Sequence, residues 1–436
     1  MSSREQYRIQ ERSPTSAFAA RTVVVLASLA LILSAFHFWP FDASRAWQTI
    51  GPTNVTVMAL VAMMVLFALR NPRQLREYAP HVSVMAYVVI TVLSLTFAPK
   101  LSRGLSFSGK LVLIAIGGYA AFMFAASTRR GLQALYAAAT AAWALAVGGC
   151  VIGRLFFARD FGFFTEASKY GSYVAILTPL CGATMLTSPR LPGKLVGMLL
   201  IAATAVSAGT VGCILAVVVG LCVAAISLGR HAWPVGLALL FCFIGVVMLW
   251  HAQFISPLRG DARLSEKDGT NLRQQYIEWQ ALVNLLEERT ATGSGAGCMN
   301  EYRSEYYYRL PKLNTLDPFN QNGWLTIAAE TGILGLVCFV WMMSYHMTMA
   351  WRTRHRSRPA WVRRYGVANL AALAGACVAQ AFSSFLFNGV LIVAILALSL
   401  AQAVALRLED SSDDAQMPYR QIPARDSGST VPLRER

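Results

Sequence analysis

Residues 195–228 read LVGMLLIAATAVSAGTVGCILAVVVGLCVAAISL, thirty-four residues without a charged side chain. A helix of about 20 apolar residues crosses the ~30 Å hydrocarbon core of a bilayer. A single crossing would leave Arg230 and the arginine-rich segment 352–364 on opposite sides of the membrane, although cytoplasmic loops collect Arg and Lys. Two short crossings, hinged at 207–210, place both on one side, and a large bundle tolerates short spans. The stretch therefore predicts a pair of membrane helices.

Similar apolar blocks recur along the whole chain, which is 56% hydrophobic and only 14% charged. Soluble domains carry about 25% charged residues. The blocks are apolar throughout rather than alternating, which predicts helices and excludes membrane strands. We therefore predict an all-α polytopic membrane protein with about twelve transmembrane helices. The predicted spans are residues 22–39, 51–69, 82–98, 109–126, 132–153, 170–187, 195–208, 210–228, 232–250, 323–345, 366–386 and 388–406.

The basic residues set the predicted orientation. Arg and Lys precede the first span and follow the second, fourth, sixth, eighth and tenth, so they share one side if both termini are cytoplasmic. The net charge of +16 is thereby explained without a nucleic-acid partner. The organisation that follows is a cytoplasmic tail (1–20), nine helices (21–251), a periplasmic loop (252–322), three helices (323–407) and a second tail (408–436). We expect both polar tails to be disordered.

The cysteines give no sign of a metal or disulfide site. Seven of the eight lie in or beside apolar spans, where cysteine usually serves as a small core residue, and Cys298 stands alone in the large loop. The chain has no CxxC pair and no metal-ligand spacing. We predict neither a metal nor a cofactor.

Two short outer loops carry basic residues against the orientation rule. Loops 99–110 and 154–169 together hold Lys100, Arg103, Lys110, Arg154, Arg159 and Lys169. These are either tolerated solvated charges or ligands for an anion at the level of the lipid headgroups. The planar fork of arginine suits a phosphate, because it donates two hydrogen bonds. The second interpretation predicts a lipid-linked phosphate or pyrophosphate as the ligand.

The large loop contains a predicted amphipathic helix at 271–289, suited to lie on the membrane or to roof a cavity. Its predicted apolar stripe is Leu272, Tyr276, Trp279, Val283 and Leu286. Arg273 lies beside the stripe, where it can point at a headgroup, and Trp279 either packs or binds substrate. A glycine run at 293–297 predicts a flexible turn. Tyrosines then alternate with charges at 301–309, a pattern that suits either sugar stacking or anchoring at the interface.

The order of these features resembles the O-antigen ligase and Wzy-type polysaccharide polymerase superfamily of bacterial inner membranes. Its members combine many spans, a short seventh–eighth hairpin and a large periplasmic loop. In that loop an Arg is followed by a Trp and a Gly-x-Gly turn, matched here by Arg273, Trp279 and 293–297. The Glu-Thr-Gly-Ile-Leu-Gly run at 330–335 matches the family's entry into the next helix, and 161–173 resembles the segment before the sixth span. The resemblance implies a GT-C-like helical fold in the inner membrane.

Two positions depart from the family pattern. The family's histidine is Gln321 here, followed by the matching Asn322, and the Ser-Arg pair of the hairpin is Ser207-Ala208. In ligases that attach O-antigen to lipid A core this histidine is considered catalytic, and glutamine cannot act as a general base. The departure favours a polymerase that extends lipid-linked oligosaccharides, closest to a xanthan-type exopolysaccharide polymerase.

The resemblance implies a metal-independent glycosyltransferase acting on undecaprenyl-diphosphate-linked oligosaccharides among membrane lipids, with a flippase and a chain-length regulator as candidate partners. Arg273 and Asp317 are the candidate catalytic residues. Candidates for binding the substrate are Arg154, Arg159, Lys169, Trp279, Arg303, Gln321 and Asn322. Asp317 is either the base or a turn residue before Pro318. Glu278, Glu305 and His251 compete for the role of base.

Two other functions fit the pattern less well. The first is an O-antigen ligase with a replaced base. The second is a transporter or flippase for the same lipid-linked glycan, which would place charged residues within its spans along a transit path. Apart from Glu330, the predicted spans are nearly free of charge, and the charge gathers at one face. This distribution favours an enzyme working at that face.

Overall fold

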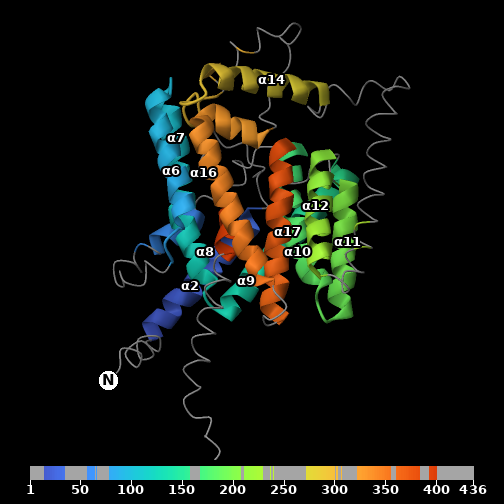
Figure 1. Ribbon diagram of the computed structural model, residues 1–436. Helices are drawn as coiled ribbons and strands as arrows, with labels where there is room; N and C mark the ends of the chain where they lie inside the picture. Colours follow the sequence, from blue (N-terminus) through green and yellow to red (C-terminus); the bar gives the residue numbers. More distant parts are fainter. Residues whose placement is uncertain are drawn as a thin grey trace, which may run out of the picture.

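The protein is described here by a computed structural model that is helical wherever its described residues form regular structure (Figure 1). The described residues are 14–34, 56–63, 65, 78–157, 167–207, 211–228, 236, 239, 272–299, 301–302, 306, 322–354, 360–382 and 392–399. Among them, four helices are long and apolar enough to cross a membrane: Leu101–Ala125, Arg129–Gly153, Gly323–Thr353 and Ala360–Phe382. Shorter apolar helices accompany them, as expected for a polytopic membrane protein. Most of the span predicted at 232–250 lies outside the described residues.

Most helices overlap the predicted apolar blocks, whereas α2 begins inside the predicted tail, α7 begins inside a predicted loop, and α14 is the predicted amphipathic helix. Their bounds are α2 (Pro14–Leu33), α6 (Val82–Leu93), η2 (Ser94–Phe97), α7 (Leu101–Val112), η3 (Leu113–Gly118), α8 (Tyr119–Ala125), α9 (Arg129–Phe157), α10 (Ala167–Leu186), α11 (Leu191–Ser207), α12 (Val211–Leu228), α14 (Leu272–Glu288), α16 (Gly323–Thr353) and α17 (Ala360–Phe382). α11 ends at Ser207 and α12 begins at Val211, and the predicted hinge residues 208–210 lie outside the described residues.

The segment predicted as the outer loop 99–110 is mostly helix. α7 begins at Leu101 and continues through η3 into α8, so Arg103 and Lys110 lie on a helix. No proline interrupts the segment, and its glycines can be accommodated by close packing. A Cβ on Gly104 would lie 2.5 Å from Leu95 Cδ2, so glycine lets α7 approach η2. Residues 99–110 are polar because the first turns of this helix lie outside the apolar core, and this composition suggested a loop.

Close approach of small residues joins α10, α12 and α17 into the centre of the bundle. Pro179 lies inside α10. A Cβ on Gly220 of α12 would lie 2.6 Å from Pro179 Cγ, and one on Gly375 of α17 would lie 3.2 Å from the same atom. In lipid, helices associate through such packing, because the surrounding tails are as apolar as the side chains. The three helices therefore pack closely against one another.

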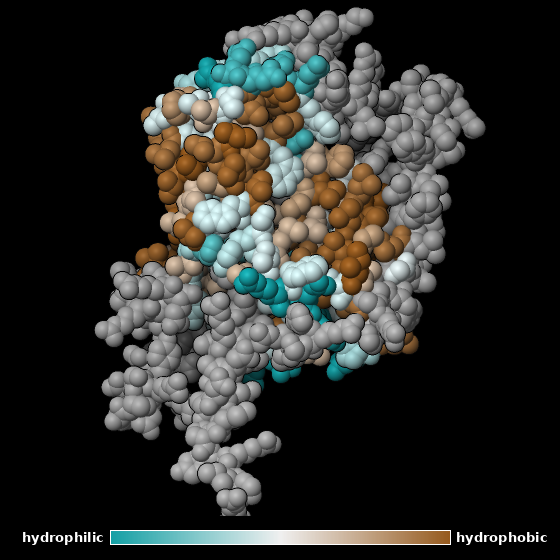
Figure 2. All heavy atoms as spheres, viewed as in Figure 1, coloured by the Kyte–Doolittle hydropathy of each residue, from teal (hydrophilic) through white to brown (hydrophobic). Residues whose placement is uncertain are grey.

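Three of the basic residues predicted to share one side of the membrane lie at one end of the bundle: Arg129, Arg190 and Arg364. The guanidinium carbon of Arg129 lies 5.5 Å from the centre of the Trp361 ring. Arg364 Nε donates to the Thr184 carbonyl oxygen at 2.7 Å, and Arg190 is exposed at the neighbouring turn. α14 covers the opposite end (Figure 1). Figure 2 shows hydrophilic surface at both ends of this face and hydrophobic surface between them, the distribution expected for a protein in a bilayer.

Candidate functional site

The glycine-rich turn at 293–297 lies buried at the α14 end of the bundle. Gly293, Gly295 and Gly297 have φ values of 65°, 87° and 70°, in the left-handed region that favours glycine. Ser294 and Ala296, between them, are fully buried. The prediction of a flexible turn is therefore wrong for these residues. Three glycines without side chains let the backbone enter a space too narrow for any other residue.

Glu330 of α16 holds this turn from one side. Its side chain is only 6% exposed, and its carboxylate accepts hydrogen bonds from the backbone N–H groups of Gly297 and Met299. A buried carboxylate without partners would cost several kcal/mol, whereas hydrogen bonds to a charged group contribute about 1.5–3 kcal/mol each. Glu330 thus ties α16 to the backbone of the turn.

A change of direction in α16 brings its backbone against the same turn. Gly332 has φ 71° and ψ −179°, which no helix residue adopts, and the outer part of α16 turns aside there beneath α14 (Figure 1). A Cβ on Gly332 would lie 2.3 Å from the Ala291 carbonyl oxygen. The Ile333 N–H, freed from the helix by the kink, donates to the Thr290 carbonyl at 2.9 Å.

Two further backbone hydrogen bonds complete the contact. Ser294 N–H donates to the Ala329 carbonyl at 2.7 Å, and Gly295 N–H donates to the Glu330 carbonyl at 3.0 Å. We call the unit formed by residues 290–299 and 329–333 the glycine clasp. The two short motifs that carried the family resemblance, the Gly-x-Gly turn and the Glu-Thr-Gly run, therefore form a single structure.

The other side of the glycine clasp rests on the corner between η2 and α7. Ala296 N–H donates to Ser94 Oγ at 3.1 Å. A Cβ on Gly295 would lie 2.6 Å from Ala98 Cα, and one on Gly297 would lie 2.8 Å from Phe107 Cβ. The turn is consequently wedged between α16 and α7. It fixes residues 290–299 relative to these two helices.

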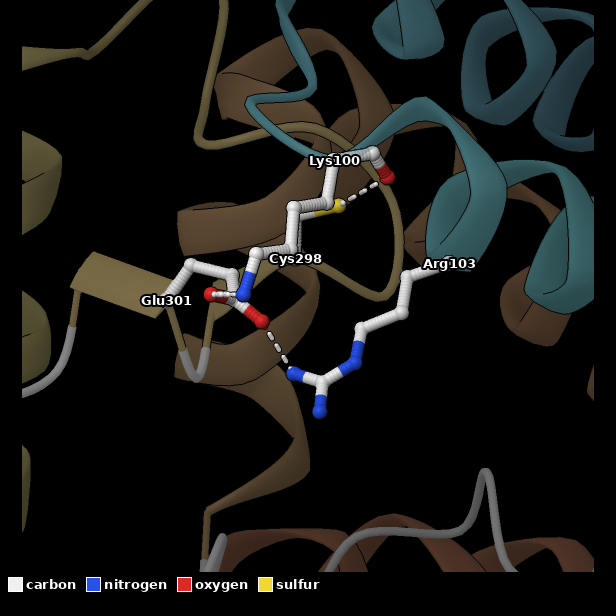
Figure 3. Close-up of polar contacts among 4 residues, drawn as sticks. All are labelled: Lys100, Arg103, Cys298 and Glu301. Carbon is white, nitrogen blue, oxygen red and sulfur yellow. Dashed lines mark hydrogen bonds and ion pairs between the residues drawn. The ribbon is translucent and has the colours of Figure 1, made fainter.

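An ion-pair cluster extends this contact to the surface (Figure 3). Lys100 Nζ lies 2.6 Å from Glu301 Oε2, and Arg103 donates to the other carboxylate oxygen. The hydrogen bond from Lys100, assisted by the charge of Arg103, holds the pKa of Glu301 below its usual value. Cys298 beside it is buried, with Sγ donating to the Lys100 carbonyl at 3.5 Å, and burial raises the pKa of its thiol. Two cations thus face one carboxylate.

The helix predicted for 271–289 is present as α14 and lies across the end of the bundle (Figure 1). Among residues 279–288, whose burial is described, Ala281, Leu282 and Leu285 are buried and pack with Met299, Tyr306 and Ala329. The predicted stripe is wrong at Val283, which is 38% exposed. The sequence holds two overlapping apolar stripes, and only the contact with the clasp and α16 selects between them.

Two tyrosines that follow the clasp also contact charged residues at the end of α14. The guanidinium carbon of Arg289 lies 4.2 Å from the centre of the Tyr302 ring, and its NH1 donates to the Tyr302 hydroxyl at 3.0 Å. The Tyr306 hydroxyl donates to the Glu288 carboxylate. These two tyrosines therefore have structural partners, a role that the sequence pattern of 301–309 did not distinguish from sugar stacking.

The structure places only part of the predicted site. Arg273 lies in the first turn of α14, Arg154 near the end of α9, and Lys169 near the start of α10. For these three residues the structure describes the backbone but not the side chain. Because α9 starts at the arginine-rich end, Arg154 lies toward the α14 end. The predicted residues Arg159, Arg303, Asp317 and Gln321 lie outside the described residues.

Asn322 and Trp279 are the predicted residues whose side chains are described. Asn322 is the N-cap of α16, and its Oδ1 accepts from Leu325 N–H at 3.1 Å, which gives it a structural role. Trp279 is partly buried, and its indole Nε1 is buried without a hydrogen-bond partner among the described residues. No group of three His, Cys, Asp or Glu that could hold a metal ion occurs within the described part of the chain.

Lys100, Arg103 and Glu301 form a cluster that sequence reasoning did not assemble. The excess of outer basic residues drew attention to Lys100 and Arg103, but 198 positions separate Arg103 from Glu301. The role of Glu330 was equally missed, although its motif was noted. A charged residue within an apolar span was the available signal.

Comparison with known proteins gives one family-model match, over about a third of the chain. Residues 196–340 match the family model described as O-antigen ligase. No curated protein matches the chain. The matched region begins in α11, includes α14 and the glycine clasp, and ends within α16. The match supports the O-antigen ligase and Wzy-type superfamily for this chain.

Proposed function

We propose that the protein is a polymerase of undecaprenyl-diphosphate-linked oligosaccharide repeat units in exopolysaccharide or O-antigen biosynthesis. It transfers the growing glycan from its lipid carrier to a new lipid-linked unit at the periplasmic face of the bacterial inner membrane. The observation that carries the proposal is the family match over 196–340, because the family's members are membrane enzymes of glycosyltransferase type acting on lipid-linked glycans.

The reaction exchanges one bond at the anomeric carbon. The bond to the phosphate oxygen of the carrier breaks, and a hydroxyl of the acceptor sugar forms the new glycosidic bond. The hydroxyl proton passes to a base, and the diphosphate leaves on the carrier. Cations placed at the leaving group stabilise its developing charge, so the reaction needs no metal.

We assign the pyrophosphate to Arg154, Arg159, Lys169 and Arg273. The first turns of α14 carry Arg273 across the end of the bundle, the level at which a lipid carrier would present its phosphates. Asp317 is the proposed base. Trp279, Arg303, Gln321 and Asn322 are proposed to line the glycan path.

An O-antigen ligase that transfers glycan to lipid A core is the second candidate, and the family match is equally compatible with it. Gln321 favours the polymerase, because it stands where the ligases keep the histidine considered catalytic, and glutamine cannot accept the proton. A transporter would need polar residues along a path through the spans. In the four described helices that could cross a membrane, Glu330 is the one carboxylate, and it is buried inside the glycine clasp rather than on such a path.

Lipid-linked intermediates in a deletion strain distinguish these candidates. If the chain is a polymerase, single lipid-linked repeat units accumulate at the outer face, because donor and acceptor still form. If it is a ligase, long lipid-linked glycans accumulate and lipid A core stays bare. Absence of lipid-linked units from the outer face, with accumulation on the inner face, would establish a flippase. Re-expression of the wild-type chain controls for effects on neighbouring genes.

A further inference from the structure

Buried polar side chains join three helices at the end of α11. Ser207, the last residue of α11, is buried, and its hydroxyl donates to the Thr204 carbonyl at 3.3 Å. The same hydroxyl oxygen therefore accepts from the hydroxyl of Tyr170 in α10, which is fully buried. From α9, the Cys150 thiol donates to the Ser207 carbonyl, with 4.0 Å between sulfur and oxygen. Ser207 thus contacts two neighbouring helices at once.

The contact between α9 and α11 includes a second polar pair. Trp143 Nε1 donates to Thr204 Oγ1 at 3.2 Å. Trp143 and Cys150 are seven residues apart, so they lie two turns apart on one face of α9. Arg154 follows Cys150 by four residues and continues the same row of positions. The face of α9 that is fixed against α11 is therefore the face on which Arg154 is placed by register.

Lys169 is placed beside the other half of this contact. It directly precedes Tyr170, near the start of α10. The Tyr170 hydroxyl therefore fixes the turn of α10 that carries Lys169 to α11, and the Cys150 thiol contacts α11 one turn before Arg154. Each of these two helices carries a residue assigned to the pyrophosphate, and both helices are held by the same serine.

We infer that Tyr170 and Ser207 are positioning residues, which set the spacing between Arg154 and Lys169. The inference rests on the proposed function, because it takes the assignment of these two cations to the pyrophosphate as given. A pyrophosphate presents two anionic phosphoryl groups side by side, so two cations on different helices reach it together only if the helices are correctly spaced. Tyr170 and Ser207 act through the helix backbones rather than by touching the lipid.

Binding of undecaprenyl diphosphate tests this inference without requiring glycan transfer. Native mass spectrometry of the purified full-length protein measures the affinity. Tyr170→Phe and Ser207→Ala each remove one hydroxyl and should each weaken binding roughly 3- to 20-fold, the equivalent of the about 0.6–1.7 kcal/mol found for hydrogen bonds between membrane helices. The double variant should lose no more than either single variant, because the two hydroxyls share one hydrogen bond.

Tyr173→Phe is the matched control on the same helix. Tyr173 lies three residues beyond Tyr170 and is equally buried. Its hydroxyl donates to Ser34 Oγ at 2.9 Å, since the Ser34 hydroxyl itself donates to the Leu31 carbonyl. This hydrogen bond joins α10 to the end of α2, which carries none of the residues assigned to the pyrophosphate. The variant should lower the thermal midpoint as Tyr170→Phe does, yet bind the lipid as the wild type does.

A second background separates positioning from general loosening of the bundle. In Lys169→Ala, the added substitution Tyr170→Phe should cause no further loss of binding, because the cation through which it acts is gone. A full further loss there, or equal losses in Tyr170→Phe and Tyr173→Phe, would overturn the inference. Absence of binding by the wild type would also overturn it. The predicted binding losses in a protein that transfers no glycan would support the inference and reject the polymerase.

Discussion

Gly332 shows how much one residue can decide in this protein. Its backbone angles, φ 71° and ψ −179°, lie in a region that is essentially restricted to glycine. An alanine there would also place its Cβ 2.3 Å from the Ala291 carbonyl oxygen. The residue therefore allows α16 to turn aside, and the turn frees the Ile333 N–H for Thr290.

We predict that Gly332→Ala opens the glycine clasp. Backbone strain of this kind costs about 1–3 kcal/mol, and the clash adds to it. Cys298, buried in the wild type, should then react faster with a membrane-impermeant thiol reagent, by roughly 5- to 150-fold. Peptide mass spectrometry assigns the label to Cys298. Gly109→Ala is the control, because a Cβ there meets nothing within 4 Å. Equal labelling of both variants would show that the kink does not hold the clasp.

We predict that substitutions of Arg159 and Arg273 lower the rate of glycan transfer. Lysine keeps the charge but loses the two-pronged hydrogen bond, so Arg→Lys variants should be partly active and Arg→Ala variants nearly inactive. Loss of a charge-assisted contact to the leaving group costs about 2–4 kcal/mol, or roughly 30- to 1000-fold in rate. The measurement is polymer yield at matched protein level. Wild-type yield from both alanine variants would exclude these residues and direct the search to Lys100, Arg103 and Arg303.

Residue identity was easier to predict than residue role. The sequence singled out Glu330 as a charge within an apolar span and 293–297 as a glycine run, and it noted the family motifs. It did not show that these two segments meet, because contacts between positions more than thirty residues apart depend on how the helices pack. The predicted flexibility was wrong for the same reason, since a glycine run favours both free loops and tightly enclosed backbone.

At the scale of elements, α7 and α14 show how composition misleads. The residues of 99–110 are polar enough for a loop, yet they form the first turns of a long helix. In α14 the amphipathic pattern predicted the helix, but it placed Val283 in the buried stripe, whereas Val283 is exposed and Leu285 is buried. Periodicity identifies a helix, while the partner surface decides which residues are buried.

The ion pair between α7 and the segment after the clasp should respond to pH. The pKa of Glu301 is lowered in the folded protein from its ordinary value of 4.5. The pair therefore contributes stability that is fully present above 4.5 and is lost as the pH falls through the lower folded value. The difference in thermal midpoint between wild type and Glu301→Gln should be constant from neutral pH down to about 5 and vanish at lower pH. A difference that grows on acidification would contradict this assignment.

At the scale of the whole molecule, the helices that are apolar enough to cross a membrane overlap the predicted apolar blocks, since length and apolarity are local properties. At one end of the bundle lie Arg129, Arg190 and Arg364, as expected if basic residues gather on one side of the membrane. The interior was less predictable. The packing of Gly220 and Gly375 on Pro179 depends on helix rotation, for which nearly uniform apolar sequences give little signal.

The orientation of the chain is testable by cysteine labelling from outside the cell. We predict that Ser265→Cys in the large loop is modified by an impermeant reagent, whereas Arg356→Cys, between α16 and α17, is protected until the membrane is opened. The reason is the gathering of arginines at the end opposite α14, which cytoplasmic loops share. The reverse labelling pattern would invert the orientation and remove the proposed site from the periplasm.

Reconstituted transfer tests the central claim most directly. The purified protein in lipid nanodiscs would receive only undecaprenyl-diphosphate-linked repeat units, with a metal chelator present, and the lipid-linked products would be sized. The account predicts a ladder of glycans extended by whole repeat units, formed by the wild type and nearly abolished by Arg273→Ala. If the wild type forms no ladder but transfers glycan once lipid A core is added, the polymerase assignment is contradicted and the protein is a ligase.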